Sequence, residues 1–557
     1  MRIALAQINP TVGALAQNSA KILDFVTQAK SKQADIVAFP ELALCGYPPE
    51  DLLHKEHFVK DNVKALQSLA KKIDGIVAII GFVDMDAKHN LYNAAAIIAN
   101  RTIKSIYRKE ALPNYGVFDE KRYFKSGDDD QKIYALNGTA FAVNICEDIW
   151  VKDGTFLKQN KMGAKLFINI SSSPYDTTKF ERRAKILKQR AKQTKSHFCY
   201  VNLVGGQDEL IFDGRSLAVD AKGKILGLGK AFEEDLVLID LSIGKTKIKK
   251  SSNVISLGSL KDKQNKTLVI APKLQKLSSV ELIYKALVLG TRDYVQKNGF
   301  KKAVIGLSGG VDSAVVAALA VEALGRENVI GVSMPSKFSS EGTKTDAKQL
   351  ATNLGIQFLE IPINDIFKVY LQTLGPVFAG QSSDTTEENL QARIRGNILM
   401  ALSNKFGWIV LTTGNKSEIA VGYCTLYGDM SGGFAVIKDI LKTKVYELSE
   451  FVNRKRAIIP QSIIDRPPTA ELRENQKDQD SLPAYEVLDE LLVHYVERHE
   501  AFGKIAKRQN IETVKRVMSM VDHSEYKRRQ APPGIKISIR AFGKDWRLPI
   551  TNKYKEF

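Results

Sequence analysis

Short apolar runs alternate with helical or polar segments over the first 240 residues. The helical segments repeat apolar residues every three or four positions, and the apolar runs are short and rich in β-branched residues. We predict helices at 19–30 and 180–195, and strands at 3–8, 36–39, 76–83, 94–99, 141–145, 166–170 and 198–204. This alternation predicts a layered α/β domain.

A polar, lysine-rich stretch then separates this pattern from a second one, and the length of 557 residues also favours more than one domain. The second pattern predicts helices at 278–297, 314–324 and 344–354, and strands at 303–307, 329–332 and 357–361. Strands that alternate with helices are typical of a doubly wound parallel sheet. We therefore predict domains at 1–243 and 278–557, joined by a linker at 244–277.

Composition narrows the class of protein. Hydrophobic residues make up 44% and charged residues 26%, no apolar run is long enough to span a membrane, and the N-terminus lacks the pattern of a signal peptide. We expect a cytoplasmic protein without a membrane partner. The net charge is +19, but the basic residues are spread along the chain, so we expect no nucleic-acid partner.

Four cysteines lie far apart in the sequence, at Cys45, Cys146, Cys199 and Cys424. They form no CxxC pair, which argues against a disulfide framework or a structural zinc site. One catalytic cysteine remains compatible with this distribution.

Three polar residues follow strand-like runs, namely Glu41, Lys109 and Cys146. A carboxylate, an ammonium group and a thiol suffice for amide hydrolysis, because the carboxylate takes the thiol proton, the thiolate attacks and the ammonium stabilises the oxyanion. A neighbouring cation also lowers a thiol pKa, so we expect a raised thiolate fraction. The alternative is that Cys146 is an ordinary buried residue.

The segments around these residues favour catalysis. PELALCGYP at 40–48, KEALPNYGVFDE at 109–120 and CEDIW at 146–150 resemble the three signature segments of the nitrilase superfamily, in its order. The resemblance implies that Glu41 is the general base, Lys109 the oxyanion-stabilising cation, Cys146 the nucleophile and Glu120 an accessory carboxylate.

The same resemblance implies a glutamine site. Tyr115, Ser173 and Lys179 would hold the substrate, although Ser171 and Ser172 compete for the serine's role. Cys45 and Cys199 lack a comparable neighbourhood, and we predict that both are structural.

A second candidate site follows the strand at 303–307. The sequence IGLSGGVDS at 305–313 ends an apolar strand and opens an apolar helix, where paired glycines and a helix N-terminus bind phosphate well. Asp312 can hold a divalent cation. A plain glycine turn is the alternative, and a Walker loop is excluded because Ile239 stands where its first glycine belongs. The predicted ATP-binding loop comprises Gly306, Leu307, Ser308, Gly309, Gly310, Val311, Asp312 and Ser313.

SGGVDS resembles the loop of PP-loop ATP pyrophosphatases, and further motifs resemble NAD synthetases in their order. These are TTGNKSE at 412–418, KTK at 442–444, RPPTAEL at 466–472 and YKRR at 526–529. The resemblance implies that ATP contacts Thr413, Lys442 and Thr469, that deamido-NAD⁺ contacts Asn389, Glu418 and Lys527, and that Mg²⁺ binds Asp312 and Glu418.

Over nearly its whole length the chain therefore resembles the glutamine-dependent NAD⁺ synthetases. The resemblance implies an α-β-β-α nitrilase-like domain and a doubly wound PP-loop domain like that of the adenine nucleotide α-hydrolases. It also implies ATP-dependent amidation of deamido-NAD⁺ with L-glutamine or ammonia, through a cysteine thioester, channelled ammonia and an adenylated dinucleotide. Mg²⁺ would be the cofactor, ATP the co-substrate, AMP and pyrophosphate products, and a dimer or larger homo-oligomer the assembly.

Several alternatives conflict with particular residues. A GMP synthetase would need a Cys-His-Glu glutaminase motif, and an asparagine synthetase would need a cysteine where Arg2 follows Met1. An RNA-binding thiolation protein would use the positive charge, but its CxxC pairs are missing. A non-catalytic nitrilase-like interaction protein is disfavoured because all three residues of the first site are present.

Overall fold

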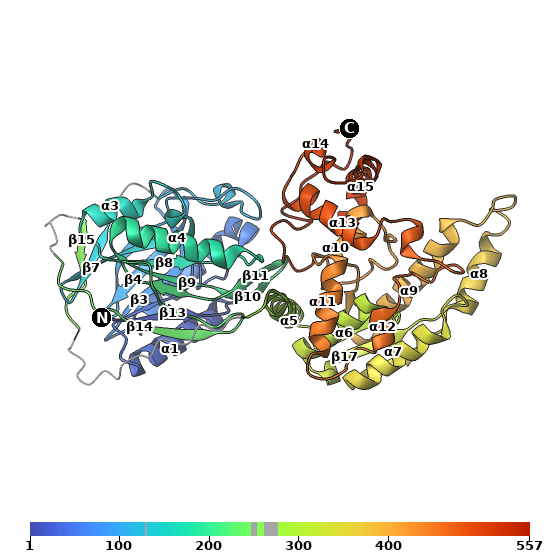
Figure 1. Cartoon of the computed structure of the whole chain (residues 1–557). Coiled ribbons are helices and arrows are strands. Elements are labelled where there is room, and N and C mark those ends of the chain that lie inside the picture. Colours follow the sequence, from blue (N-terminus) through green and yellow to red (C-terminus); the bar gives the residue numbers. More distant parts are fainter. Residues whose placement is uncertain (128–130, 247–252, 261–276) are drawn as a thin grey trace. The chain divides into compact units, whose positions relative to one another are not determined.

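The computed structural model describes residues 1–127, 131–246, 253–260 and 277–557 (Figure 1). It divides into two compact units, one comprising Met1–Gln207 with Ile211–Lys276 and the other Asp208–Leu210 with Leu277–Phe557. Much of the predicted linker, at 247–252 and 261–276, lies outside the described residues. None of the helices in the described ranges combines the length and apolar character that a membrane crossing requires.

The first unit contains two large sheets and most of a short β-ribbon. One sheet has the order β14 (Asp235–Asp240), β1 (Arg2–Gln7), β2 (Ile36–Ala38), β3 (Val77–Met85), β4 (Leu91–Ala99) and β5 (Thr102–Arg108). The other has the order β13 (Ile225–Leu228), β12 (Leu217–Val219), β9 (His197–Asn202), β8 (Leu166–Ser171), β7 (Thr139–Ile145), β6 (Ile133–Leu136) and β15 (Val254–Ser256). The ribbon pairs β10 (Val204–Gln207) with β11 (Leu210–Asp213).

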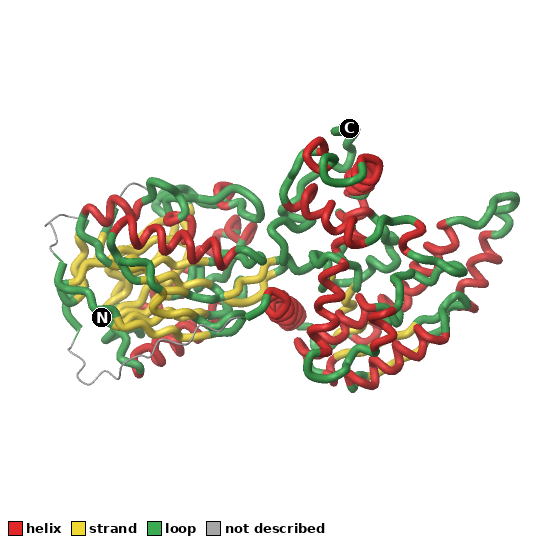
Figure 2. The backbone as a smooth tube through the Cα atoms, in the orientation of Figure 1, coloured by secondary structure: helices red, strands yellow, loops and turns green. Residues whose placement is uncertain are grey.

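Three apolar clusters hold these sheets in a four-layer α-β-β-α arrangement. The middle cluster joins the two sheets, because it contains residues of both, such as Ile3 of β1 and Val143 of β7. The outer clusters pack one sheet against α1 (Leu15–Ser31) and α2 (Glu56–Ala70), and the other against α3 (Thr155–Lys161) and α4 (Lys179–Thr194) (Figure 2).

The strand period of two explains why both faces of a central strand are apolar. In β1, Ile3 and Leu5 belong to the cluster between the sheets, whereas Ala4 and Ala6 belong to the helix-facing cluster. Successive side chains of a strand point to opposite faces, so a strand covered on both sides is a continuous apolar run. The strand predictions in this unit rest on such runs.

The second unit contains a five-stranded parallel sheet. Its order is β18 (Gln357–Glu360), β17 (Val329–Ser333), β16 (Ala303–Gly306), β19 (Ile409–Thr412) and β20 (Phe434–Ala435). Chain order runs outward from β16 in both directions, which makes the edge between β16 and β19 the switch point where open α/β sheets bind ligands. The predicted fold class is confirmed for both units.

Several helices begin earlier than predicted. Helix α6 spans Val311–Leu324 and α7 spans Glu341–Leu354, each about one turn longer than its apolar pattern. Ser340 caps α7, because its hydroxyl accepts a hydrogen bond from the backbone N–H of Thr343 at 3.2 Å. Polar first turns held by such caps carry no apolar signal.

Candidate active sites

Three strand ends of the first unit position the predicted residues of the first site. Glu41 follows β2, Lys109 follows β5, and Cys146 follows β7 directly. The Lys109 ammonium donates to Glu41 Oε1 at 2.6 Å and to both carboxylate oxygens of Glu120 at 2.8 Å. All of these groups are buried. The structure thus joins the predicted cation to both predicted carboxylates.

Burial changes the acid–base properties of this cluster. Burial raises the pKa of Glu120 to about 7, against the opposing effect of Lys109. Burial alone would lower the pKa of Lys109, but Glu120 and Glu41 outweigh it and raise that pKa well above its ordinary value. Lys109 is therefore a permanent cation, which suits a group that stabilises an oxyanion.

The Glu41 carboxylate is held in one orientation. Asn93 Nδ2 donates to Oε1 at 2.7 Å, and the backbone N–H of Ser172 donates to Oε2 at 2.8 Å. The Ser172 hydroxyl also donates to the backbone oxygen of Glu41 at 2.8 Å. Ser172 therefore positions Glu41, the predicted base. Ser171 and Ser173 remain as the candidates for the serine that binds glutamine.

Cys146 has a strained backbone at the end of β7. Its φ of 39° lies in the left-handed region, which a non-glycine residue adopts only at a cost in backbone strain. Burial raises the pKa of the Cys146 thiol, Glu41 raises it further, and Lys109 only partly offsets them. Our expectation of a raised thiolate fraction is therefore wrong, because desolvation outweighs the effect of the neighbouring cation on the pKa of the thiol.

Two of the predicted glutamine-binding residues, Tyr115 and Lys179, contact the CEDIW segment. The Tyr115 hydroxyl donates to Glu147 at 3.0 Å, and the Lys179 ammonium lies 4.9 Å from the centre of the Trp150 ring. Burial lowers the pKa of Lys179. The backbone N–H of Ser173, the third predicted residue, donates to Asn202 Oδ1 at 3.0 Å, outside that segment.

Sequence reasoning missed Glu147 as a candidate. It directly follows the predicted nucleophile and accepts the hydrogen bond of Tyr115, and its charge also acts on the pKa of Cys146. Its place inside CEDIW was the available signal, because a carboxylate beside the nucleophile suits the amino group of glutamine.

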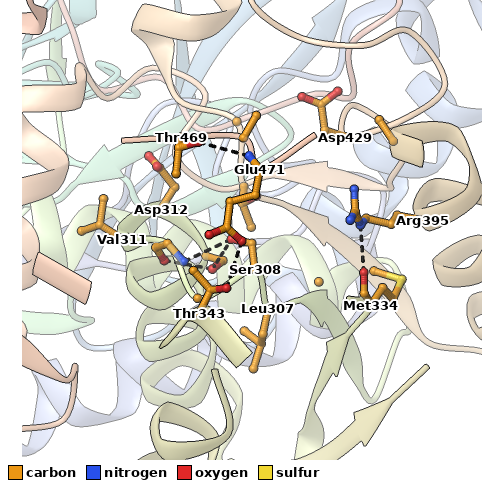
Figure 3. Close-up of a pocket in the computed structure, with 18 of the residues that line it drawn as sticks. Leu307, Ser308, Val311, Asp312, Met334, Thr343, Arg395, Asp429, Thr469 and Glu471 are labelled. Carbon is orange, nitrogen blue, oxygen red and sulfur yellow. Dashed lines mark hydrogen bonds between the residues drawn. The ribbon is translucent and has the colours of Figure 1, made fainter. Parts of the chain in front are cut away.

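The second predicted site lines one cavity of about 310 Å³ in the second unit (Figure 3). The cavity lies where β16 leads into α6, at the switch point of the sheet. The predicted residues that line it are Gly306, Leu307, Ser308, Gly309, Gly310, Val311, Asp312, Ser313, Thr413, Glu418, Lys442 and Thr469.

The loop's glycines are required by its geometry. Gly309 has a φ of +79°, and a Cβ there would lie 2.3 Å from the backbone oxygen of Thr343. The hydroxyls of Ser308 and Ser313 lie 3.2 Å apart, beside the N-terminus of α6. A close backbone turn that opens a helix and carries hydroxyl donors is suited to phosphate.

Two carboxylates and one ammonium group meet in this cavity. The Lys442 ammonium contacts the carboxylate of Asp312 and lies 3.3 Å from Glu418 Oε1. Asn415 Nδ2 donates to Asp312 Oδ1 at 2.9 Å. Burial raises the pKa of Glu418 to about 8; Lys442 opposes the rise and Asp312 adds to it.

These residues fit a magnesium ion. Mg²⁺ in nucleotide sites takes one or two protein carboxylates and completes its shell with phosphate oxygens and water. Asp312 and Glu418 supply two carboxylates that approach one ammonium group. The described residues contain no group of three or more His, Cys, Asp or Glu side chains that could hold a metal ion.

Two predicted dinucleotide contacts do not line the cavity. Lys527 donates to the backbone oxygens of Gly422 at 2.7 Å and Cys424 at 2.8 Å, and Asn389 Oδ1 accepts from the Thr425 hydroxyl at 2.7 Å. Thr425 itself lines the cavity. In the structure both residues therefore support the 422–425 segment of the cavity wall.

Arg395 lines the cavity and was not predicted. Its Nε donates to the backbone oxygen of Met334 at 3.0 Å, as Figure 3 shows. Burial lowers the pKa of Arg395 to about 10. It lies within the helix α9 (Thr385–Phe406), where neither its spacing nor its neighbours distinguish it from a surface arginine.

Binding of MgATP at pH 7 is expected to release about one proton from the protein. Glu418, with a pKa of about 8, is largely protonated at pH 7, and a cation beside it lowers that pKa. Calorimetric titration in buffers of different ionisation enthalpy measures this release. The Glu418→Gln variant is the control, and its binding enthalpy should not depend on the buffer. The prediction would be contradicted if the binding enthalpy of the wild-type protein were also independent of the buffer.

Comparison with known protein families agrees with this two-site architecture. The carbon-nitrogen hydrolase family model matches residues 2–248, and the NAD synthase model matches residues 283–531. The chain thus joins a segment that matches the carbon-nitrogen hydrolase family to one that matches the NAD synthase family.

Similar proteins match over the full length. A glutamine-dependent NAD(+) synthetase of Thermotoga maritima is 48% identical, with 100% of this chain and 99% of that protein covered; one of Aquifex aeolicus is 46% identical, with 100% of both covered. The structure of such a synthetase from Acinetobacter baumannii, in complex with ADP, is 40% identical, with a TM-score of 0.76 over 99% of this chain and 98% of that one. The chain belongs to the family of glutamine-dependent NAD⁺ synthetases.

Proposed function

We propose that residues 1–243 release ammonia from glutamine and that residues 278–557 use it to amidate deamido-NAD⁺, with 244–277 as the linker. The observation that carries this proposal is the pairing of two chemically distinct sites: a buried Glu41–Lys109–Glu120 cluster near Cys146, and a phosphate-type loop beside two carboxylates. The ADP complex of the Acinetobacter baumannii relative supports an adenine nucleotide in the second site.

In the proposed glutaminase reaction, Glu41 takes the thiol proton of Cys146 as the sulfur attacks the amide carbon of glutamine. The Lys109 ammonium stabilises the oxyanion, and Glu120 fixes that ammonium in place. Ammonia leaves with a proton from Glu41 and a glutamyl thioester remains. Glu41 then takes a proton from water, whose oxygen attacks the thioester carbon; the C–S bond breaks, glutamate leaves, and Glu41 returns the proton to the Cys146 sulfur. A base is needed because burial keeps the resting thiol protonated.

In the proposed synthetase reaction, an oxygen of the nicotinate carboxylate attacks the α-phosphorus of ATP and pyrophosphate leaves. Ammonia then attacks the adenylated carbonyl carbon and AMP leaves. The loop 306–313, Thr413, Lys442 and Thr469 would bind ATP, and Asn389, Glu418 and Lys527 would contribute to the dinucleotide side. Bound Mg²⁺, held by Asp312 and Glu418, would offset the negative charge of the phosphates.

Ammonia would pass between the sites inside the protein. Ammonia in neutral water is mostly ammonium, which is not a nucleophile, so an interior path keeps it reactive. A homo-oligomer, dimer or larger, is also part of the proposal.

The synthetase reaction should yield AMP and pyrophosphate in equal amounts. A PP-loop, unlike a Walker loop, implies cleavage between the α- and β-phosphates. Incubation with deamido-NAD⁺, ATP, Mg²⁺ and ammonia, followed by chromatographic analysis of the nucleotides, measures the products. ADP and inorganic phosphate in place of AMP and pyrophosphate would contradict the adenylation step.

A further inference from the structure

A second carboxylate of the CEDIW segment has a different environment from Glu147. Asp148 is fully buried, and four hydrogen-bond donors surround its two oxygens. Oδ2 accepts from the Tyr107 hydroxyl at 2.7 Å and from the backbone N–H of Ile145 at 2.9 Å. Oδ1 accepts from the backbone N–H groups of Ala111 at 2.9 Å and Glu110 at 3.2 Å.

These four donors flank two proposed catalytic residues. Ile145 directly precedes the nucleophile, while Tyr107, Glu110 and Ala111 lie within two residues of Lys109 on either side. The two segments belong to different sheets, since β5 ends one segment and β7 the other. The Asp148 carboxylate therefore links the segment around Lys109, the proposed oxyanion-stabilising residue, to the backbone beside Cys146, the proposed nucleophile.

We propose that Asp148 is a positioning residue of the glutaminase site, which fixes the separation between the Cys146 sulfur and the Lys109 ammonium. Asp148 touches neither group with its own side chain; it acts through the backbone on either side of them. This inference rests on the proposed roles of Cys146 and Lys109.

The bonding pattern requires a carboxylate rather than an amide. All four partners of Asp148 are donors, so an ionised carboxylate satisfies every one of them. An asparagine has a single acceptor oxygen, and its amide nitrogen would oppose two of the donors, whichever way it is turned. Two buried donors would then lose their acceptor, and the backbone beside Lys109 or Cys146 would shift to regain one.

The left-handed backbone conformation of Cys146 explains why the hydrogen bonds of Asp148 are needed. A non-glycine residue at a φ of 39° persists only where its surroundings enforce that conformation. The Ile145 N–H, bonded to Asp148, lies one residue before this strained position, and the Asp148 side chain folds back over it within the same turn. The hydrogen bond between Ile145 and Asp148 thus stabilises the backbone directly beside the strained residue Cys146.

Asp148→Asn tests the inference in the full-length enzyme. We expect kcat with glutamine to fall about 100-fold, because a displacement of about 1 Å between reacting groups has this effect. The KM for glutamine should change little, since Asp148 does not contact the substrate site residues described above. NAD⁺ formation from ammonia should stay at the wild-type rate. Alkylation of Cys146 by iodoacetamide should slow, which a general loss of stability would not cause.

Two further variants provide the comparison. Tyr107→Phe removes one of the four donors and keeps the carboxylate, so a smaller loss of about tenfold in kcat with glutamine is expected. Asp35→Asn is the matched control: it alters another buried aspartate of the same unit, which accepts from the backbone N–H of Arg2 at 2.7 Å, away from the site. It should leave kcat with glutamine unchanged.

The outcomes separate this inference from the proposed function. Wild-type kcat with glutamine in both Asp148→Asn and Tyr107→Phe would overturn the positioning role, and so would an equal loss of the ammonia-dependent rate. If Asp148→Asn does not fold, Tyr107→Phe alone tests the positioning role: a wild-type kcat with glutamine in that variant would overturn it. Glutamine use by Cys146→Ala would instead overturn the proposed function itself, whatever Asp148 does.

Discussion

Cys146→Ala is expected to abolish NAD⁺ synthesis from glutamine while leaving synthesis from ammonia near the wild-type rate. The substitution removes the sulfur that would form the glutamyl thioester, and loss of a covalent nucleophile costs about 10⁴-fold or more in rate. The synthetase site lies in the other unit and needs no thiol. Parallel assays of NAD⁺ formation, with glutamine or with an ammonium salt at elevated pH, measure both activities.

Cys199→Ala is the matched control for this experiment. Cys199 is also a fully buried cysteine of the first unit, but it lies within β9 and has no carboxylate or ammonium partner comparable to those of the first site in the described structure. It should retain both activities. Glutamine use by Cys146→Ala would mean that the thiol is structural, and loss of ammonia use in a folded variant would mean that the sites are not separable.

The fold was predictable because its strands are covered on both faces. The runs at 3–6 in β1, 166–168 in β8 and 303–305 in β16 are continuously apolar, and such runs identify strands whatever their partners. Helix starts were less predictable, because the first turns of α6 and α7 are polar or serve the phosphate-type loop. The pairing of strands into two sheets in the first unit depends on contacts between residues up to about 240 positions apart, as between β1 and β14.

The candidate sites were predictable where residues lie inside one motif. SGGVDS and the three nitrilase-like segments carry their chemistry in consecutive residues. Arg395 and Asp148 were not predictable, because their importance comes from groups that are distant in the sequence, such as Met334 and Tyr107. The thiol pKa was predicted in the wrong direction because desolvation depends on burial, which no local sequence pattern gives.

Asp312→Asn and Glu418→Gln are expected to lower NAD⁺ synthesis by about 100- to 1,000-fold with either nitrogen donor. Both carboxylates approach the Lys442 ammonium and line the cavity that contains the SGGVDS loop. Each substitution removes a carboxylate that would bind the cation beside the phosphates. It also leaves the Lys442 ammonium with a single carboxyl partner. Glutamine hydrolysis should continue, because the first site lies in the other unit.

The loss of NAD⁺ synthesis in these two variants should depend on the Mg²⁺ concentration, and it should not result from a lower stability of the protein. A rise in Mg²⁺ concentration should partly restore either variant, since weaker cation binding is compensated by mass action. The control is Asp365→Asn, which removes a negative charge from the exposed first turn of α8 (Asn364–Leu374) and should leave synthesis unchanged at every Mg²⁺ concentration. Wild-type synthesis by a folded Asp312→Asn or Glu418→Gln variant would remove the metal assignment. Loss of ammonia-dependent synthesis without any response to Mg²⁺ would show that the carboxylates act mainly by orienting Lys442.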